Sequence, residues 1–179
     1  SVSMIHPGYN LLAEGWADLA DDAFAIVQRT AQGLGLPLRS LEIELGPSQV
    51  EAVFDPTDAL TAADQMVLFR NGVRQALRRA GYHASFVCRP PFANVMASGW
   101  HLHQSLVDAS TGESRFRRDA PAAGSTPGDA GHTLSPLGEQ FLAGLLAHAR
   151  GMAVCCTPTI NGFGRFRPNA LAPMSVLWG

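Results

Sequence analysis

Lysine is absent from this sequence of 179 residues, and all 13 of its basic residues are arginine. Schiff-base chemistry, a lysine nucleophile and the lysine of a P-loop all require a primary amine, so these chemistries are excluded. The 15 acidic residues bring the net charge to −2, which gives no positive field for nucleic acid. No apolar run approaches the roughly 20 residues of a membrane span. We therefore expect a soluble protein with no nucleic-acid or membrane partner, in which arginine binds any anion.

Cysteine is also scarce. The three cysteines, Cys88, Cys155 and Cys156, are an odd number without the spacing of a disulfide framework, which favours a reducing compartment. Free cysteine usually behaves as a small apolar core residue, and we expect that here. Residues 1–10 contain no basic stretch followed by an apolar one, so no secretory signal is predicted. The expected location is the cytoplasm.

The spacing of apolar residues predicts an α+β fold. Apolar positions three and four residues apart indicate helices, and strict alternation indicates strands. The fold we expect is a mainly antiparallel, curved sheet covered by three helices. The predicted helices span residues 16–34, 59–80 and 137–155, and the predicted strands span residues 38–45, 49–54, 82–88 and 99–107.

Local signals mark the ends of two of these helices. Asp58 is expected to cap the start of the second helix and Gly81 to close it. Ser135 followed by Pro136 is typical of a helix start, and the helix after it is expected to turn an apolar face to the core. Residues 108–133 are rich in Gly, Ala, Ser, Pro and Asp, which predicts a mobile loop that opens with a turn at residues 111–112.

Carboxylates gather on the predicted hairpin of residues 38–54. Glu42 and Glu44 share one face of its first strand, and Gln49 and Glu51 share one face of its second. Opposed side chains on an antiparallel pair lie about 5 Å apart, so Glu44 and Glu51 could converge. Converging carboxylates repel unless a positive group lies between them, and a divalent cation is the common solution. The alternative is a solvated polar face of an exposed hairpin.

Two further groups place reactive side chains close together. Alternation puts His101, His103 and Ser105 on one strand face, from which they could bind a metal or a phosphate. Their alternative is a polar face whose imidazoles bond to neighbours. Arg165 and Arg167 lie in a glycine-broken loop and could bind a carboxylate or a phosphate, or make surface salt bridges instead.

Four motifs in order then resemble the catalytic domain of glutamine synthetase. They are Glu44-Leu-Gly-Pro-Ser-Gln-Val-Glu51, Ser98-Gly-Trp-His-Leu-His-Gln-Ser-Leu106, Pro158-Thr-Ile-Asn-Gly-Phe-Gly-Arg-Phe-Arg-Pro168 and Ala172-Pro173. The resemblance implies that residues 1–179 form part of that domain, without its N-terminal β-grasp neighbour and without its C-terminal part. It also implies a homo-oligomer in the full-length protein, with sites formed between subunits, so we expect the chain to be inactive alone.

The chemistry that the resemblance implies is an ATP-dependent ligation. The γ-carboxylate of glutamate, or a related acid, is phosphorylated, and ammonia or an amine then displaces phosphate from the acyl phosphate. Two divalent ions, Mg²⁺ or Mn²⁺, neutralise the oxyanions. By motif position, the first metal is bound by Glu44 and Glu51 and the second by His101, the nucleotide by His103 and Ser105, and the substrate by Gly99 and by the catalytic Arg165, which clamps the glutamate carboxylate.

The sequence also departs from the family pattern. Met96-Ala97 stands where ammonia-using enzymes have Asn-Gly, Leu171 stands at the place of the flap acid, and Gly164 replaces a lysine. These departures resemble a divergent branch that joins glutamate to a larger amine, so we expect an acceptor other than ammonia. Two alternatives stay open: a catalytically dead member that serves assembly or regulation, and an unrelated metal-binding domain with His101, His103 and Glu51 around one ion.

Overall fold

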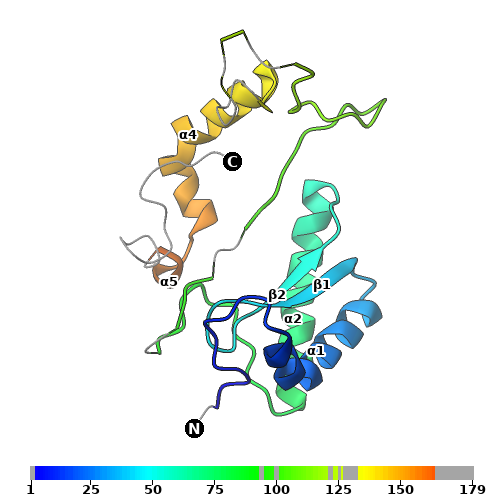
Figure 1. Cartoon of the computed structure of the whole chain (residues 1–179), viewed down its shortest axis with the longest axis vertical. Helices are drawn as coiled ribbons and strands as arrows, with labels where there is room; N and C mark the ends of the chain where they lie inside the picture. Colours follow the sequence, from blue (N-terminus) through cyan, green and yellow to red (C-terminus); the bar gives the residue numbers. More distant parts are fainter. Residues whose placement is uncertain are drawn as a thin grey trace. The chain divides into compact units, whose positions relative to one another are not determined.

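The computed structural model describes residues 3–92, 95–98, 101–120, 123–124, 126 and 133–163. It divides into two compact units, Ser1–Ser98 and Gly99–Gly179, which we call unit 1 and unit 2 (Figure 1). Unit 1 contains α1 (Glu14–Gly33), β1 (Leu38–Ile43), β2 (Val50–Phe54) and α2 (Ala59–Arg79), and unit 2 contains α4 (Pro136–Cys156) and α5 (Ile160–Phe163). The α+β class is confirmed, and the three long helices begin and end within about two residues of the predicted bounds.

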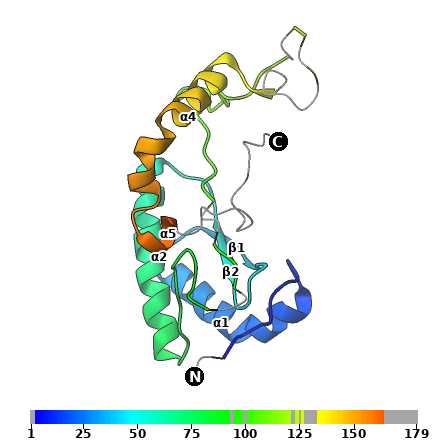
Figure 2. The same ribbon diagram turned by 90° about the vertical axis from the view of Figure 1, so that its left-hand side faces the viewer.

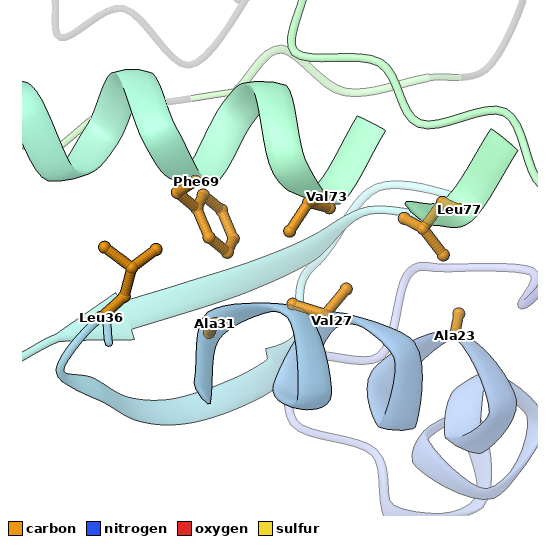
Figure 3. Close-up of a cluster of buried hydrophobic side chains, with 7 residues drawn as sticks. All are labelled: Ala23, Val27, Ala31, Leu36, Phe69, Val73 and Leu77. Carbon is orange, nitrogen blue, oxygen red and sulfur yellow. The ribbon is translucent and has the colours of Figure 1, made fainter. Parts of the chain in front are cut away.

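The core of unit 1 lies between α1, α2 and the hairpin of β1 and β2. Each helix contributes a stripe of residues spaced by four, so each stripe stays on one face. Figure 3 shows the stripe of α1 pointing toward the stripe of α2, with Leu36 beside them. Alanine at two of the α1 positions lets the helices, which lie side by side in Figure 2, pack closely. The buried cluster consists of Ala23, Val27, Ala31, Leu36, Phe69, Val73 and Leu77.

The predicted caps are confirmed. The Oδ1 of Asp58 accepts the N–H of Thr61 at 3.0 Å. Hydrogen bonds from the side chain and from the backbone of Thr61 hold the pKa of the Asp58 carboxyl below its usual value. Gly81 follows α2 at a φ of +86°, a conformation that favours glycine. The Oγ of Ser135 accepts the N–H of Gly138 at 3.1 Å at the start of α4.

Two of the four predicted strands are absent from the described residues, whose sheet has only β1 and β2. Residues 82–88 do alternate in burial, since Tyr82, Ala84 and Phe86 pack against the core. Residues 101–106 are exposed and belong to no ladder, and Val107 forms a single bridge with Ser114. Alternation describes which side chains are covered, whereas a strand also needs a neighbour that pairs with it along a ladder, and among the described residues these two segments have only isolated backbone hydrogen bonds.

The predicted core face of α4 is only partly buried in the part of unit 2 that the structure describes. Phe141 is half-buried and its ring lies 5.1 Å from that of Phe116, but Leu146 is 49% exposed and Met152 is 38% exposed. Cys155 and Cys156 are exposed as well, so the interpretation of these two cysteines as core residues is wrong. An apolar helical stripe predicts burial only when another element covers it.

The segment after residue 107 begins with the predicted turn. Gly112 has a φ of +74°, and the N–H of Arg115 donates to the carbonyl of Leu106 at 2.8 Å across the turn. The mobility expected for residues 108–133 stays a prediction.

Among the described residues, no helix is both long and apolar enough to cross a membrane.

Candidate functional site

The register of the hairpin decides which carboxylates meet. Glu42 is paired with Glu51, and the N–H of Glu44 donates to the carbonyl of Gln49 at 3.0 Å. Glu44 therefore lies opposite Gln49 and not directly opposite Glu51. The two are diagonal neighbours on the same face, a relation that places their Cα atoms about 7–8 Å apart.

This face of the hairpin is polar, and the other is apolar. Leu41 and Ile43 alternate with the acids of β1, and Leu41 packs against the core between the helices. Ile43 is only 2% exposed. The opposite face, which we call the carboxylate face, is half-buried and consists of Glu42, Glu44, Gln49 and Glu51.

Hydrogen bonds hold the side chains of Glu42, Glu44 and Gln49. The Oγ of Ser40 donates to Glu42 at 2.6 Å, and the N–H of Leu45 donates to the Oε2 of Glu44 at 2.9 Å. The N–H of Gly46 donates to the Oε1 of Gln49 at 3.0 Å, so the Gln49 side chain closes the turn.

Residues 4–12, which we call the strap, run along the edge of this hairpin. The N–H of Tyr9 donates to the carbonyl of Leu45 at 2.6 Å, and the N–H of Leu12 donates to that of Ile43 at 3.0 Å. Both donors have positive φ angles, 61° and 54°, which non-glycine residues seldom adopt. The strap therefore satisfies carbonyls that β1 would otherwise leave unpaired at its edge.

The start of the strap meets the hairpin turn. The carbonyl of His6 accepts the N–H of Ser48 at 3.0 Å, and the N–H of Ile5 donates to the Oγ of Ser48 at 2.8 Å. Gly8, at a φ of +77°, lies so close that a Cβ there would be 2.5 Å from the nitrogen of Pro47. Only glycine fits this contact without a shift of the backbone.

His6 is the residue that sequence reasoning missed. Its side chain is 2% exposed, and its Nε2 lies 3.0 Å from the carbonyl oxygen of Gln49. A carbonyl only accepts, so Nε2 carries a proton, while the buried Nδ1 has no hydrogen-bond partner. Burial lowers the pKa of His6, against the opposing effect of the Gln49 carbonyl. A single histidine in a segment without periodicity gave no signal that it would be buried.

A second loop reaches the same turn. Ala97 is buried, and the N–H of Ser98 donates to the carbonyl of Cys88 at 2.7 Å. A Cβ on Gly46 would lie 3.1 Å from the Cβ of Met96, so this methionine packs against the turn. The position at which the sequence departs from the ammonia-using pattern is thus next to the carboxylate face.

The remaining predicted site residues belong to unit 2. His101, His103 and Ser105 are exposed and outside any strand. Gly99 and Arg165 lie outside the described residues. Within the described part of the chain, no three His, Cys, Asp or Glu side chains form a group that could hold a metal. The hairpin carboxylates are in unit 1 and His101 is in unit 2.

Comparison with known proteins identifies the family. The family model described as the catalytic domain of glutamine synthetase matches residues 10–179. The chain belongs to the glutamine synthetase family. Its relatives in this family are named as glutamine synthetases and as ligases of glutamate with amines, so the family is one of ligases.

Three similar proteins show the range of this family. The chain is 40% identical over 178 residues to a gamma-glutamylanilide synthase of Acinetobacter sp, covering 99% of this chain and 34% of the relative. It is 32% identical over 160 residues to a glutamate–isopropylamine ligase of Pseudomonas sp, covering 89% and 32%. Among solved structures, apo GmaS without ligand superimposes with a TM-score of 0.72 at 28% identity, covering 92% of this chain and 36% of that one. The chain thus spans about a third of the length of these glutamine synthetase relatives.

Proposed function

We propose that this chain contributes the first metal-binding part of the site of an ATP-dependent γ-glutamyl ligase. The observation that carries the proposal is the carboxylate face, where Glu44 and Glu51 lie on one side of a hairpin whose turn is held from two directions. The sequence match to the glutamine synthetase family supports the same assignment. Since the chain spans about a third of its relatives, the whole activity would need residues outside these 179, and we expect the chain alone to be inactive.

The donor chemistry of the carboxylate face fits a hard divalent cation. Mg²⁺ and Mn²⁺ prefer carboxylate and amide oxygens, which is what Glu44, Gln49 and Glu51 present. In the proposal Glu44 and Glu51 bind the first ion and His101 binds the second. When bound, the ions and ATP would supply charge neutralisation and the phosphoryl group.

The proposed reaction balances in two transfers. A γ-carboxylate oxygen of glutamate takes the terminal phosphoryl group of ATP, and ADP leaves. The amine nitrogen then bonds to the γ-carbon, inorganic phosphate leaves, and the nitrogen gives up a proton. In this scheme Gly99 and Arg165 hold the glutamate, with the Arg165 fork on its carboxylate, while His103 and Ser105 contact the nucleotide.

The proposed acceptor is an amine larger than ammonia. Leu171 has no carboxylate with which to deprotonate ammonium, and Met96-Ala97 replaces Asn-Gly beside the hairpin turn. The names of two relatives, a gamma-glutamylanilide synthase and a glutamate–isopropylamine ligase, include amines of this kind. Both observations favour an amine that carries an apolar substituent.

Product analysis tests the acceptor. The full-length protein that carries this chain is incubated with ATP, Mg²⁺ and glutamate, and with equal concentrations of ammonium, isopropylamine or aniline. We expect kcat/KM for one of the two organic amines to exceed that for ammonium by at least about tenfold, which corresponds to 1.4 kcal/mol of transition-state binding. Efficient formation of glutamine from ammonium would contradict the proposal.

A second candidate is a family member without turnover that serves assembly or regulation in a homo-oligomer. Leu171 and Gly164 favour it, because both replace groups expected in an active enzyme. This candidate predicts that the full-length protein binds Mn²⁺ but forms no ATP-dependent product from any amine in the same assay.

A further inference from the structure

The strap has no task in the proposed reaction. The family model begins at residue 10, so His6 and Gly8 lie before the matched part of the chain. Nevertheless, the polar contacts of residues 4–6 fall on Ser48 and Gln49, in the turn that separates Glu44 from Glu51. The strap is therefore attached at the point from which both proposed ligands project.

One atom connects His6 to a proposed ligand. The carbonyl oxygen of Gln49 accepts two hydrogen bonds, one from the Nε2 of His6 at 3.0 Å and one from the N–H of Glu44 at 3.0 Å. A carbonyl has two lone pairs, so both bonds can form together. The position of this oxygen thus depends on the buried imidazole, and the backbone of Glu44 depends on the oxygen.

The turn itself needs such support. Ser48 has a φ of 57°, which a non-glycine residue keeps only where its surroundings hold it. Its N–H is bound by the carbonyl of His6, and its Oγ accepts the N–H of Ile5 and donates to the Sδ of Met4 at 3.3 Å. His6 therefore contacts the turn through both its backbone and its side chain.

We propose that His6 is a positioning residue for the carboxylate face: its buried imidazole fixes the Gln49 carbonyl, and so sets the spacing at which Glu44 and Glu51 bind a divalent cation. The role is that of an outer partner of metal ligands, whose removal generally weakens metal binding by about 10–100-fold. This inference rests on the proposed function of the hairpin.

The test measures Mn²⁺-induced broadening of the backbone amide resonances of residues 44–51 in the full chain. His6→Leu removes the donor, and we expect it to need at least about tenfold more Mn²⁺ for the same broadening. His6→Gln keeps an N–H donor at a similar reach, and we expect it to stay within about threefold of the unsubstituted chain. Rescue by glutamine would distinguish positioning from simple filling of space.

Two control variants separate positioning by His6 from general destabilisation of unit 1. Val73→Ala opens the buried core at a residue that is 3% exposed and outside the strap, so it destabilises unit 1 without altering the Gln49 contact. His83→Leu removes an exposed histidine of the same unit. We expect both to leave the Mn²⁺ dependence unchanged. If Val73→Ala weakens binding as much as His6→Leu does, general destabilisation explains the effect and the inference is wrong.

Glu51→Gln separates the proposed metal role of the hairpin from the proposed role of His6. If the resonances of residues 44–51 do not broaden in the unsubstituted chain, or if Glu51→Gln leaves the broadening unchanged, the proposed metal role of the hairpin fails and the inference fails with it. If Glu51→Gln abolishes broadening but His6→Leu does not change it, only the role of His6 is overturned.

Discussion

Replacing Phe69 with alanine is expected to lower the free energy of unfolding of unit 1 by about 3–5 kcal/mol. The side chain is 5% exposed, and its ring lies 4.9 Å from that of Phe54 and 6.1 Å from that of Phe86, both at steep angles. Alanine would remove the buried ring, leave a cavity between α2 and the hairpin, and end both edge-to-face contacts. A loss of this size is a large part of the 5–15 kcal/mol that stabilises a typical domain.

Urea unfolding followed by circular dichroism measures this effect, with Leu68→Ala as its matched control. Leu68 precedes Phe69 on the same helix but is 50% exposed, so we expect its replacement to change the unfolding free energy by less than about 1 kcal/mol. Equal stabilities of the two variants would show that the cluster in Figure 3 is not the core of unit 1.

Gly8→Ala is expected to have the second largest effect on stability. The left-handed conformation alone costs an alanine about 1–2 kcal/mol. The new Cβ would also lie 2.5 Å from the nitrogen of Pro47 and 2.8 Å from the carbonyl carbon of Gly46, and these are backbone atoms that cannot rotate away. The strap must then move off the turn, so we expect a total loss above about 3 kcal/mol.

Gly35→Ala isolates the conformational part of that loss. Gly35 has a similar φ of +66°, but a Cβ there would meet nothing within 4 Å. We expect this variant to lose only the 1–2 kcal/mol of the left-handed conformation, about half the loss of Gly8→Ala or less. Thermal unfolding of the two variants side by side gives the comparison, and a Gly8→Ala protein as stable as Gly35→Ala would mean that the strap is not tied to the turn.

Local features were predictable from the sequence, because a few neighbouring residues decide them. The caps formed by Asp58 and Ser135 depend on donors three residues away, and both are present as expected. The family, too, could be inferred from motifs that are each contiguous in sequence, and the comparison confirms it.

The register of the hairpin was not predictable from alternation alone. The turn contains Ser48 at a positive φ, and the pair of Glu44 with Gln49 closes it. Nothing in the residue types of Gly46-Pro47-Ser48 specifies that geometry, so the pairing of Glu51 with Glu42 could not be inferred from them. In a hairpin the turn fixes the register, and an error in the turn shifts every pair.

Features that depend on distant partners escaped prediction altogether. His6 is buried because its ring meets a carbonyl 43 residues away, and a sequence without such long-range information gives it no role. Residues 82–88 and 101–106 alternate as strands do, but neither forms a ladder with another described segment. Alternation of apolar and polar residues predicts the two faces of a segment, whereas strand pairing depends on which other segment lies beside it.

The measurement that tests the central claim most directly is a calorimetric titration of the chain with Mn²⁺, beside its Glu51→Gln and Glu42→Gln variants. Glu42 is the matched control, because it is a carboxylate on the same face, paired with Glu51, and is not one of the two proposed ligands. We predict that the unsubstituted chain and Glu42→Gln bind Mn²⁺ similarly and that Glu51→Gln binds at least about tenfold more weakly. The absence of binding by the unsubstituted chain, or equal binding by both variants, would contradict the assignment of Glu51 to a metal site.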